Sequence, residues 1–364
     1  TYPFGNSNNP LKVPNASLGA MPAVDRTWET IETYNAGIDF ATLNNRLNGT
    51  FDYFIKDNKN MFYAEEFPTI LGTSAPSING AHVRTNGWEL TLNWKDKIGK
   101  VGYRIGFNLS DNKTKVISLS DSRNPGHGLM AFVEGYPTNS FFIYEFDGFI
   151  KDEADLADYK AKMKGGVPTN LRVGDAKYID KDGDGVLEPT LYKEGDPNSG
   201  DIVYKGTNNQ RYLYGINLGL DWKGIDVSVF LQGVGKWDCI NGTYAGGGEV
   251  WKQSSQYFYH NTWSPDRPNA EYPRLTQDGG IHGYNYQWSD APYKFFNNRY
   301  LRLKEVQIGY TFPTTLTKKI GVEKLRVYAT GMNLLEWDNL PNGFDPEAPY
   351  TETVSYTHLT LPTT

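Results

Sequence analysis

Apolar and polar side chains alternate along two neighbouring stretches of this chain, residues 86–96 and 101–110. The apolar positions are Trp88, Leu90, Leu92 and Trp94 in the first stretch and Val101, Tyr103, Ile105, Phe107 and Leu109 in the second. Because successive side chains of a β-strand point to opposite sides, this pattern predicts an antiparallel hairpin with one apolar and one polar face. Such a hairpin fits a half-buried sheet of a soluble protein or the wall of a transmembrane β-barrel.

The spacing of further alternating stretches separates these two alternatives. It predicts spanning strands at 34–42, 46–58, 84–96, 101–116, 210–223, 225–235, 298–312 and 323–337. Short turns at 43–45, 97–100, 223–224 and 313–322 then alternate with long connections at 59–83, 117–209, 236–297 and after 338. Outer-membrane barrels have short periplasmic turns and long extracellular loops, whereas a soluble sandwich has no reason to adopt this arrangement. The sequence therefore favours the barrel.

The same argument places the segments within the longest connection. If all short turns lie on one side, an even number of spanning strands must separate them, so the apolar stretch Phe141–Ile150 does not span alone. We expect it in an extracellular excursion, as a small hairpin, together with a short helix over 153–164. In the strand at 298–312 the apolar positions change face, which predicts a β-bulge near Lys304 and Glu305.

Composition agrees with a barrel and argues against several other classes. The mean hydropathy of −0.57 is low, as expected when only every second strand residue faces lipid and the loops are polar. No run of about 18 apolar residues could form a transmembrane helix. The net charge of −6 includes no basic patch suited to nucleic acid. The single cysteine, Cys239, has no partner for an internal disulfide. The first residues lack a signal-peptide pattern, so we expect the chain to be a fragment.

Short motifs follow one another in order along residues 26–350. They are Trp28-Glu29 with Asn35-Ala36-Gly37-Ile38-Asp39, Asn86-Gly87-Trp88-Glu89-Leu90, Gly174-Asp175 leading into Asp182-Gly183-Asp184-Gly185, Phe230-Leu231-Gln232-Gly233, Trp263-Ser264-Pro265, Tyr300-Leu301-Arg302-Leu303-Lys304 and Asp345-Pro346-Glu347. In number and order they resemble the C-terminal half of the SusC/RagA-type TonB-dependent outer-membrane transporters of Bacteroidota. The plug domain, TonB box and closing aromatic-ending strand of that family have no counterpart in the sequence.

The resemblance implies an all-β fold, namely a fragment of an antiparallel transmembrane β-barrel of about 22 strands with long extracellular loops. This chain would supply about eight of the spanning strands. Residues 1–33 would be an extracellular loop, and residues 34–353 would be the C-terminal part of the transporter barrel. Residues 354–364 resemble a translated sequencing adapter, and we expect them to be an artifact.

The resemblance also implies a function, which is TonB-dependent import of a nutrient across the outer membrane without enzymatic activity. The default substrate is an oligosaccharide, with peptides left open. A SusD-like lipoprotein would cover the extracellular mouth, the TonB–ExbB–ExbD complex would act through the plug, and outer-membrane lipid would surround the barrel. A secreted β-sandwich that binds calcium and glycans is a second hypothesis, and a passive porin is a third. No H-E-x-x-H or G-x-S-x-G motif supports catalysis.

Alternating acidic residues surround a glycine turn at Asp180, Asp182 and Asp184. Oxygens at alternate positions around a glycine form the start of a calcium loop, so the sequence predicts Ca²⁺ binding here. Glu188, at the ninth position, would ligate the ion directly or through water. An EF-hand would need Glu at the twelfth position, where Leu191 stands, so a solvated acidic turn remains the alternative.

Two further sets of side chains are candidates for contact with a substrate. Aromatic faces stack on sugars and other flat ligands, and the connection 236–297 is rich in them; the positions singled out are Trp251, Tyr257, Tyr259 and Trp263. Packing within the long connection, or against a partner lipoprotein, is the alternative for these aromatics. Polar strand positions would face a water-filled lumen, and those we predict to do so are Glu89, Asn93, Arg104, Asn108, Asn217 and Asp221.

Overall fold

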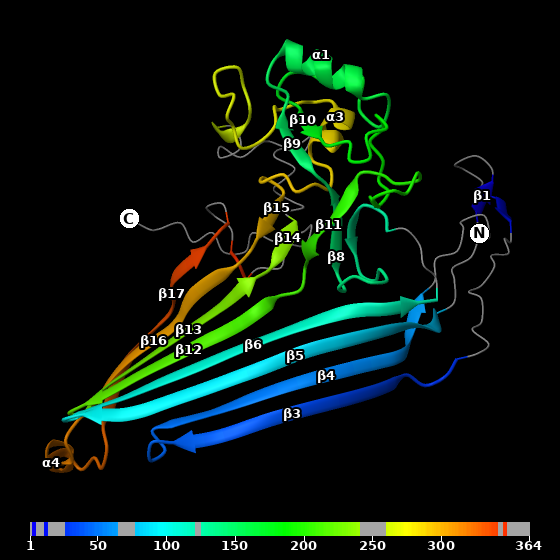
Figure 1. Ribbon diagram of the computed structural model, residues 1–364. Coiled ribbons are helices and arrows are strands. Elements are labelled where there is room, and N and C mark those ends of the chain that lie inside the picture. Colours follow the sequence, from blue (N-terminus) through cyan, green and yellow to red (C-terminus); the bar gives the residue numbers. More distant parts are fainter. Residues whose placement is uncertain are drawn as a thin grey trace.

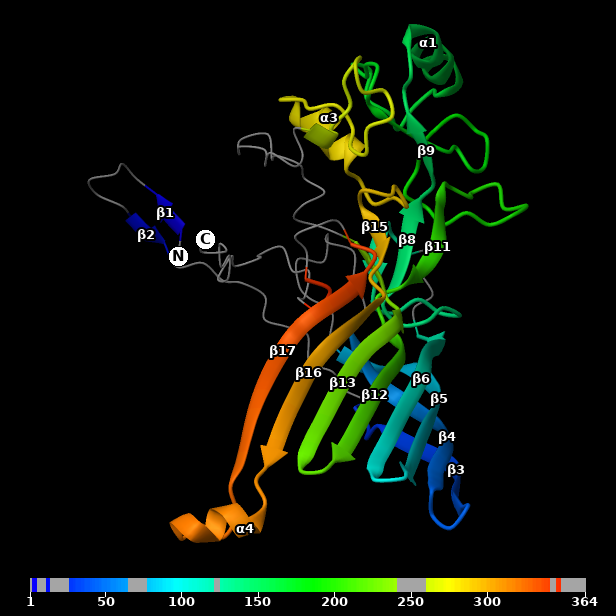
Figure 2. The ribbon, with the colours of Figure 1, turned by 90° about the vertical axis from the view of Figure 1, so that its left-hand side faces the viewer.

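The computed structural model describes residues 2–4, 11–13, 26–64, 77–120, 125–240, 260–340 and 345–347. It contains two regions of different construction (Figure 1). One is a long sheet of antiparallel strands, and the other is a compact region stacked on one end of it. We call this second region the crown, which consists of residues 125–209, 237–240 and 260–297. Seen from the side, the sheet is a single inclined layer below the crown (Figure 2).

Eight strands form the sheet, in the order β17-β16-β13-β12-β6-β5-β4-β3. Their bounds are β3 Thr30–Thr42, β4 Leu47–Ala64, β5 Ser77–Ile98, β6 Val101–Leu119, β12 Arg211–Trp222, β13 Ile225–Lys236, β16 Tyr300–Thr311 and β17 Arg326–Asp338. Each predicted strand is present, and β6 pairs directly with β12 across the long insertion between them. The predicted even number of strands between the short turns is thereby confirmed, because Phe141–Ile150 adds no strand to this sheet.

The register confirms the predicted bulge, and several strands are longer than predicted. β3 begins at Thr30, inside the predicted loop 1–33. Leu303 pairs with Leu231 but Glu305 pairs with Phe230, so Lys304 is the extra residue. β4 and β5 continue into the predicted connection 59–83, where Tyr63 still pairs with Ile78. This extension lies beyond the last apolar row, and a strand that no longer faces lipid has no reason to keep the alternation by which the strands were predicted.

Tight turns close the end of the sheet opposite the crown. Lys223 and Gly224 both have positive φ, at 48° and 87°, as the two central residues of a type I′ turn require. β16 and β17 are joined by the short helix α4 Thr314–Thr317 and the 3-10 turn η2 Lys318–Ile320. Within the described residues, no helix has the length and apolar character needed to cross a membrane. Near the N-terminus, β1 Tyr2–Phe4 pairs with β2 Leu11–Val13.

The crown joins two connections that lie far apart in the sequence. Its elements are β7 Gly128–Met130, β8 Ser140–Tyr144, β9 Phe146–Phe149, α1 Glu153–Lys162, β10 Ala176–Tyr178, β11 Ile202–Thr207, β14 Asp238–Ile240, α3 Gly279–Asn285 and β15 Phe295–Asn297. β8 lies between β7 and β11, while β9 pairs with β10 and β14 with β15. The predicted hairpin within Phe141–Ile150 is therefore wrong, because its two halves, β8 and β9, pair with different strands.

The predicted short helix is confirmed as α1. The side chain of Asp152 accepts a hydrogen bond of 2.8 Å from the backbone N–H of Asp155, which caps the first turn. Acidic residues in the first turn and lysines in the last turn suit the helix dipole. Leu156 and Tyr159 are the buried residues of the helix, and they anchor it to the rest of the crown.

Most of the apolar core of the molecule lies in the crown. Its fully buried large side chains include Phe141, Phe142, Ile143, Ile150, Leu171, Tyr178, Ile202, Tyr272, Ile281 and Tyr293. The hydroxyls of Tyr159 and Tyr284, 125 positions apart, are 2.9 Å from each other and tie the two connections together. On the sheet, by contrast, large apolar side chains are open to the surroundings, with exposed fractions of 66% at Ile38 and 44% at Ile105.

Candidate functional site

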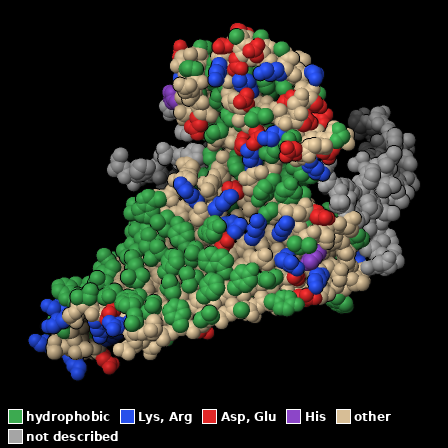
Figure 3. All heavy atoms as spheres, in the orientation of Figure 1, with side chains coloured by type: hydrophobic (Ala, Val, Ile, Leu, Met, Phe, Trp, Pro, Cys, Tyr) green, Lys and Arg blue, Asp and Glu red, His purple; other side chains and the backbone are tan. Residues whose placement is uncertain are grey.

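One face of the sheet is apolar across all eight strands. Directly paired residues of antiparallel strands point to the same side, so the register defines each row of this face. One such row runs from Ile105 through Leu218 and Val229 to Val306. Figure 3 shows the apolar side chains as one broad area on the sheet. We call this surface the apolar face, and a continuous exposed surface of this kind on a single-layered sheet suits contact with lipid.

Aromatic side chains border the apolar face at both ends. At the end with the tight turns, the Trp94 indole donates a hydrogen bond of 3.2 Å to the Tyr103 hydroxyl, and Trp222 is 42% exposed. Toward the crown, the rings of Phe51 and Trp88 stack with their centroids 6.5 Å apart. Two aromatic girdles around an apolar band are typical of barrels that cross a membrane, because these rings favour the interface between lipid and water.

The opposite face is polar, and the structure brings all six predicted lumen positions to it. Asn93, Gly106 and Asn217 form one directly paired row, and the other positions follow at even steps along the same strands. The full set on this face is Glu89, Asn93, Arg104, Asn108, Asn217 and Asp221. The Nη1 atom of Arg104 lies 2.8 Å from the carboxylate of Asp221. That this polar face borders a transport passage stays a prediction.

Glycines on the polar face give its longer side chains room to lie flat. A Cβ at Gly219 would stand 2.3 Å from Nε of Arg104, and one at Gly215 would stand 2.5 Å from Oδ1 of Asn108. Four of the predicted positions border one hollow of about 760 Å³, namely Asn93, Arg104, Asn108 and Asn217. The polar face is therefore hollowed and lined by hydrogen-bonding groups, which is the chemistry that a water-filled passage needs.

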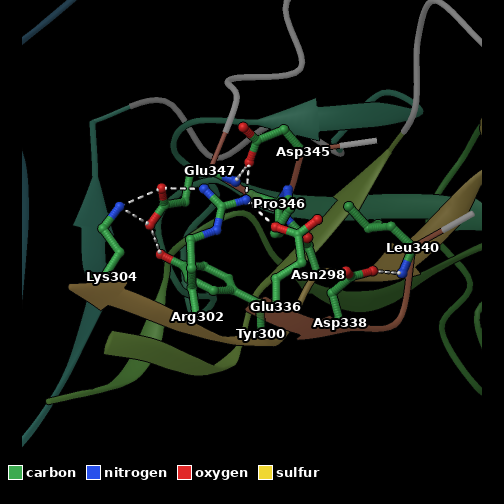
Figure 4. A network of polar contacts seen from close by, with 10 residues as sticks. All are labelled: Asn298, Tyr300, Arg302, Lys304, Glu336, Asp338, Leu340, Asp345, Pro346 and Glu347. Atoms are coloured by element: carbon green, nitrogen blue, oxygen red, sulfur yellow. Dashed lines mark hydrogen bonds and ion pairs between the residues drawn. The ribbon is translucent and has the colours of Figure 1, made fainter. Parts of the chain in front are cut away.

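A buried arginine at the crown end of the sheet holds three carboxylates (Figure 4). Arg302, with a side chain 7% exposed, contacts Glu347 and Asp345 at 2.6 Å each and also contacts Glu336. Lys304 adds a second cation 2.8 Å from Glu347. Arg302 pairs with Gln232, so it points to the polar face. The network fixes the segment after β17 against the start of β16.

Sequence reasoning quoted these residues as motifs but missed that they meet. The signal that could have found the contact is the charge complementarity of the two motifs, one with two cations and the other with two carboxylates. The amide of Asn298 adds a hydrogen bond of 2.9 Å to the carbonyl of Pro346, so the backbone of the same segment is held as well.

The acidic turn has three of the four predicted ligands close together. Carboxylate oxygens of Asp180, Asp182 and Asp184 all lie within 4.8 Å of one another, and Glu188 is not part of this group. Asp180 accepts hydrogen bonds of 2.8 Å from the N–H groups of Gly183 and Gly185, which hold the turn in shape. Carboxylate oxygens are among the ligands that Ca²⁺ takes in proteins. That Glu188 ligates the ion directly or through water stays a prediction.

A fourth carboxylate, missed by the sequence analysis, supports the acidic turn from beneath. Asp201 is buried, and its carboxylate accepts hydrogen bonds of 2.5 Å from the backbone N–H of Lys181 and of 2.7 Å from that of Glu188. Burial raises the pKa of the Asp201 carboxyl to about 6, and the negative charges of Asp182 and Asp180 act in the same direction. This buried group therefore senses the charge of the turn above it.

Most of the aromatic residues that the structure describes in the connection 236–297 pack inside the crown. Of the four predicted contact positions, Trp251, Tyr257 and Tyr259 lie outside the described residues. Trp263 is half-buried and packs against the backbone of Gly174, where a Cβ would stand 2.2 Å from the ring. Tyr284 is buried in the core with α1. For the described part of this connection, the structure therefore shows the alternative interpretation, internal packing.

These observations define a class of protein. A single-layered antiparallel sheet with a girdled apolar face, a polar face, tight turns at one end and an extended crown at the other is the wall of a transmembrane β-barrel. The secreted sandwich predicts that Trp88, Trp94 and Trp222 are buried in a core. This hypothesis is wrong, because the eight strands form one layer and Trp222 is 42% exposed.

Comparison with known proteins agrees with this class. No family model matches the chain. It is 27% identical to TonB-dependent receptor P3 of Formosa agariphila over 336 residues, which covers 89% of this chain and 31% of that receptor. It is 24% identical to TonB-dependent receptor SusC of Bacteroides thetaiotaomicron over 369 residues, covering 95% of this chain and 32% of SusC.

Solved structures show the same fold. The RagAB peptide importer in its open-open state matches with a TM-score of 0.66 and 22% identity, over 92% of this chain and 34% of that chain. The closed-closed state matches with a TM-score of 0.65 and 22% identity, over 89% of this chain and 33% of that chain. The chain thus spans about a third of the length of the proteins it matches. These matches confirm the predicted resemblance to SusC/RagA-type TonB-dependent receptors, the transmembrane barrel fold and the outer-membrane location.

Proposed function

We propose that this chain forms part of the barrel wall of an importer that takes up a nutrient across the outer membrane with energy supplied through TonB. The observation that carries the proposal is the division of one sheet into a girdled apolar face and a hollowed polar face with the ion pair of Arg104 and Asp221. A barrel wall that is polar inside gives a hydrophilic substrate a wet path through lipid. The likeness of nearly the whole chain to TonB-dependent receptors supports the coupling to TonB.

We infer that the substrate is an oligosaccharide and that a SusD-like lipoprotein covers the extracellular mouth. The resemblance to SusC supports both inferences, and the crown provides a folded surface at the mouth on which a lid protein could dock. A peptide is the second candidate substrate, favoured by the likeness of the fold to that of RagAB, a peptide importer. The barrel and crown would carry binding, whereas energy coupling through TonB–ExbB–ExbD would belong to a plug.

Uptake by intact cells tests this proposal. Cells that carry the full-length gene, a deletion of it, or a deletion of TonB would be given fluorescent oligosaccharides and fluorescent peptides of similar mass. We expect accumulation of one class only, abolished in both deletion strains. Uptake that persists without TonB would favour the passive porin, and equal uptake in all strains would contradict import by this protein.

The acidic turn supports a second proposal, that Asp180, Asp182 and Asp184 hold a Ca²⁺ ion which stabilises the crown. The three clustered carboxylates support it, since like charges at such distances repel unless a cation lies among them. Calorimetric titration of the full-length receptor with Ca²⁺ tests it. Asp182→Asn should weaken binding about tenfold, whereas Asp158→Asn, an exposed carboxylate on α1, should not change it. Absence of Ca²⁺ binding in the unaltered protein would contradict the proposal.

A further inference from the structure

A group of basic side chains stands on the same side of the sheet as the apolar face, just beyond its crown end. Along β6 the positions that point to this side are apolar from Val101 to Leu109 and continue as Asp111, Lys113 and Lys115. Eight steps of about 3.4 Å make the apolar part about 27 Å long, which a strand tilt of about 40° reduces to about 21 Å along the membrane normal, slightly less than the apolar band of about 25 Å in membrane barrels. Lys113 and Lys115 therefore lie at the level where headgroups replace lipid chains.

The neighbouring strand adds a third cation at the same level. Arg84 of β5 pairs directly with Lys115, and Asn86 pairs with Lys113. The guanidinium of Arg84 holds both carboxylate oxygens of Asp57, at 2.8 and 3.0 Å, yet its side chain is still 43% exposed. The guanidinium of Arg84 is thus fixed in orientation, and part of it remains accessible from outside the sheet.

The two lysines have no such acidic partner. Both are exposed, and neither side chain has a hydrogen bond or ion pair with any residue that the structure describes. The nearest carboxylate below them on β6, that of Asp111, is held by Arg211. Asp57 already compensates the charge of Arg84, which stands directly opposite Lys115, whereas no carboxylate of the described residues pairs with the ammonium group of Lys113 or Lys115. Figure 3 shows Lys and Arg side chains gathered along the border between the apolar area and the crown.

We propose that Lys113, Lys115 and Arg84 bind a phosphate of a lipid headgroup in the outer leaflet. A phosphate monoester carries up to two negative charges and three acceptor oxygens, which match two ammonium groups and one guanidinium better than a single carboxylate does. The lipid chains of the same molecule would lie on Trp88 and Leu109, directly below. The site would anchor the barrel at a fixed depth and attach a specific lipid to its outer surface.

Native mass spectrometry of the full-length receptor in detergent tests this site. The protein would be incubated with lipid A carrying two phosphates and, separately, with its dephosphorylated form. We expect retention of the phosphorylated lipid only, weakened roughly 25-fold in the double variant Lys113→Gln/Lys115→Gln, at about fivefold per lysine. The matched control Lys318→Gln/Lys319→Gln removes the same charge from exposed lysines at the opposite end of the sheet and should retain the lipid as the unaltered protein does.

Two further variants guard against a trivial loss of folding. Lys113→Arg/Lys115→Arg keeps the charges and should retain the lipid as the unaltered protein does. Lys115→Gln alone should weaken retention of the phosphorylated lipid about fivefold. Equal retention by the unaltered protein and the Gln double variant would overturn the proposal. So would equal retention of phosphorylated and dephosphorylated lipid, which would show that the acyl chains alone are recognised.

Discussion

The sheet and the crown use the same aromatic and aliphatic residues in opposite ways. In the crown, Tyr178 is 1% exposed and lies among side chains from both long connections. On the sheet, Trp222 is 42% exposed and belongs to a surface that no other protein layer covers in the described structure. The crown is thus stabilised by its own packing, while the sheet depends on lipid and on hydrogen bonds between strands. The difference shows that one chain contains a region folded for water, the crown, and a region folded for contact with lipid, the sheet.

The largest effect is expected where a crown side chain is removed from the core. Phe142→Ala should lower the free energy of unfolding of the crown by about 3–5 kcal/mol, because a fully buried ring leaves a cavity. Hydrogen exchange at the backbone amides of β8 and β11, followed by mass spectrometry of the full-length protein, would measure it. Amides of β6 and β12 within the apolar band should keep their protection; loss of protection throughout would mean that the crown and sheet unfold as one unit.

A charge placed on the sheet should distinguish its two faces. Ile105→Arg puts a cation in the middle of the apolar face and should cost about 2–4 kcal/mol of stability in a bilayer. Thr91→Arg adds the same charge to the polar face and should cost less than about 1 kcal/mol. Urea titration of the barrel folded into lipid vesicles measures both, and equal losses at the two positions would contradict the assignment of the faces.

The crown should also respond to pH through Asp201. Its folded-state pKa of about 6 lies above the ordinary value of 3.8, so the folded state keeps a proton that the unfolded state has lost. The contribution of Asp201 to stability is therefore greatest below about pH 4 and falls, on the order of 2 kcal/mol, as the pH rises to about 6. Thermal unfolding of the crown between pH 4 and 7 measures this slope, and Asp201→Asn should flatten it. A slope that is unchanged in Asp201→Asn would assign the effect to other groups.

The smallest effect is expected at the ion pair of Arg104 and Asp221 on the polar face. Both side chains are more than half exposed, so Arg104→Ala should change stability by less than about 1 kcal/mol. A transport role predicts a larger change in uptake than in stability. Parallel measurements of uptake and of urea unfolding would separate the two, and a loss of stability above about 2 kcal/mol would show that the pair is structural.

The sheet could be predicted from the sequence, whereas the crown, apart from helix α1, could not, for physical reasons. A strand with one face against lipid must alternate apolar and polar side chains, so positions such as Leu90, Leu92 and Trp94 reveal the strand in the sequence. The short turns fix which strands are neighbours. The crown depends on contacts between distant positions, such as the side-chain amide of Asn285 donating to Asp175 at 2.9 Å across 110 residues. No local sequence pattern predicts such a contact.

The candidate sites divide in the same way. The positions on the polar face followed from alternation alone, and the acidic turn followed from local spacing. Arg302 with its three carboxylates, and the buried Asp201, depend on tertiary placement and were missed.

Labelling of single cysteines along 103–108 tests the central claim most directly, which is that this sheet separates lipid from water. In full-length protein carrying Cys239→Ser, each position would be replaced by cysteine and exposed to a membrane-impermeant thiol reagent in intact cells. We predict that Arg104→Cys, Gly106→Cys and Asn108→Cys react, whereas Tyr103→Cys, Ile105→Cys and Phe107→Cys stay protected. Uniform reaction at all six positions, or the reverse alternation, would contradict the account.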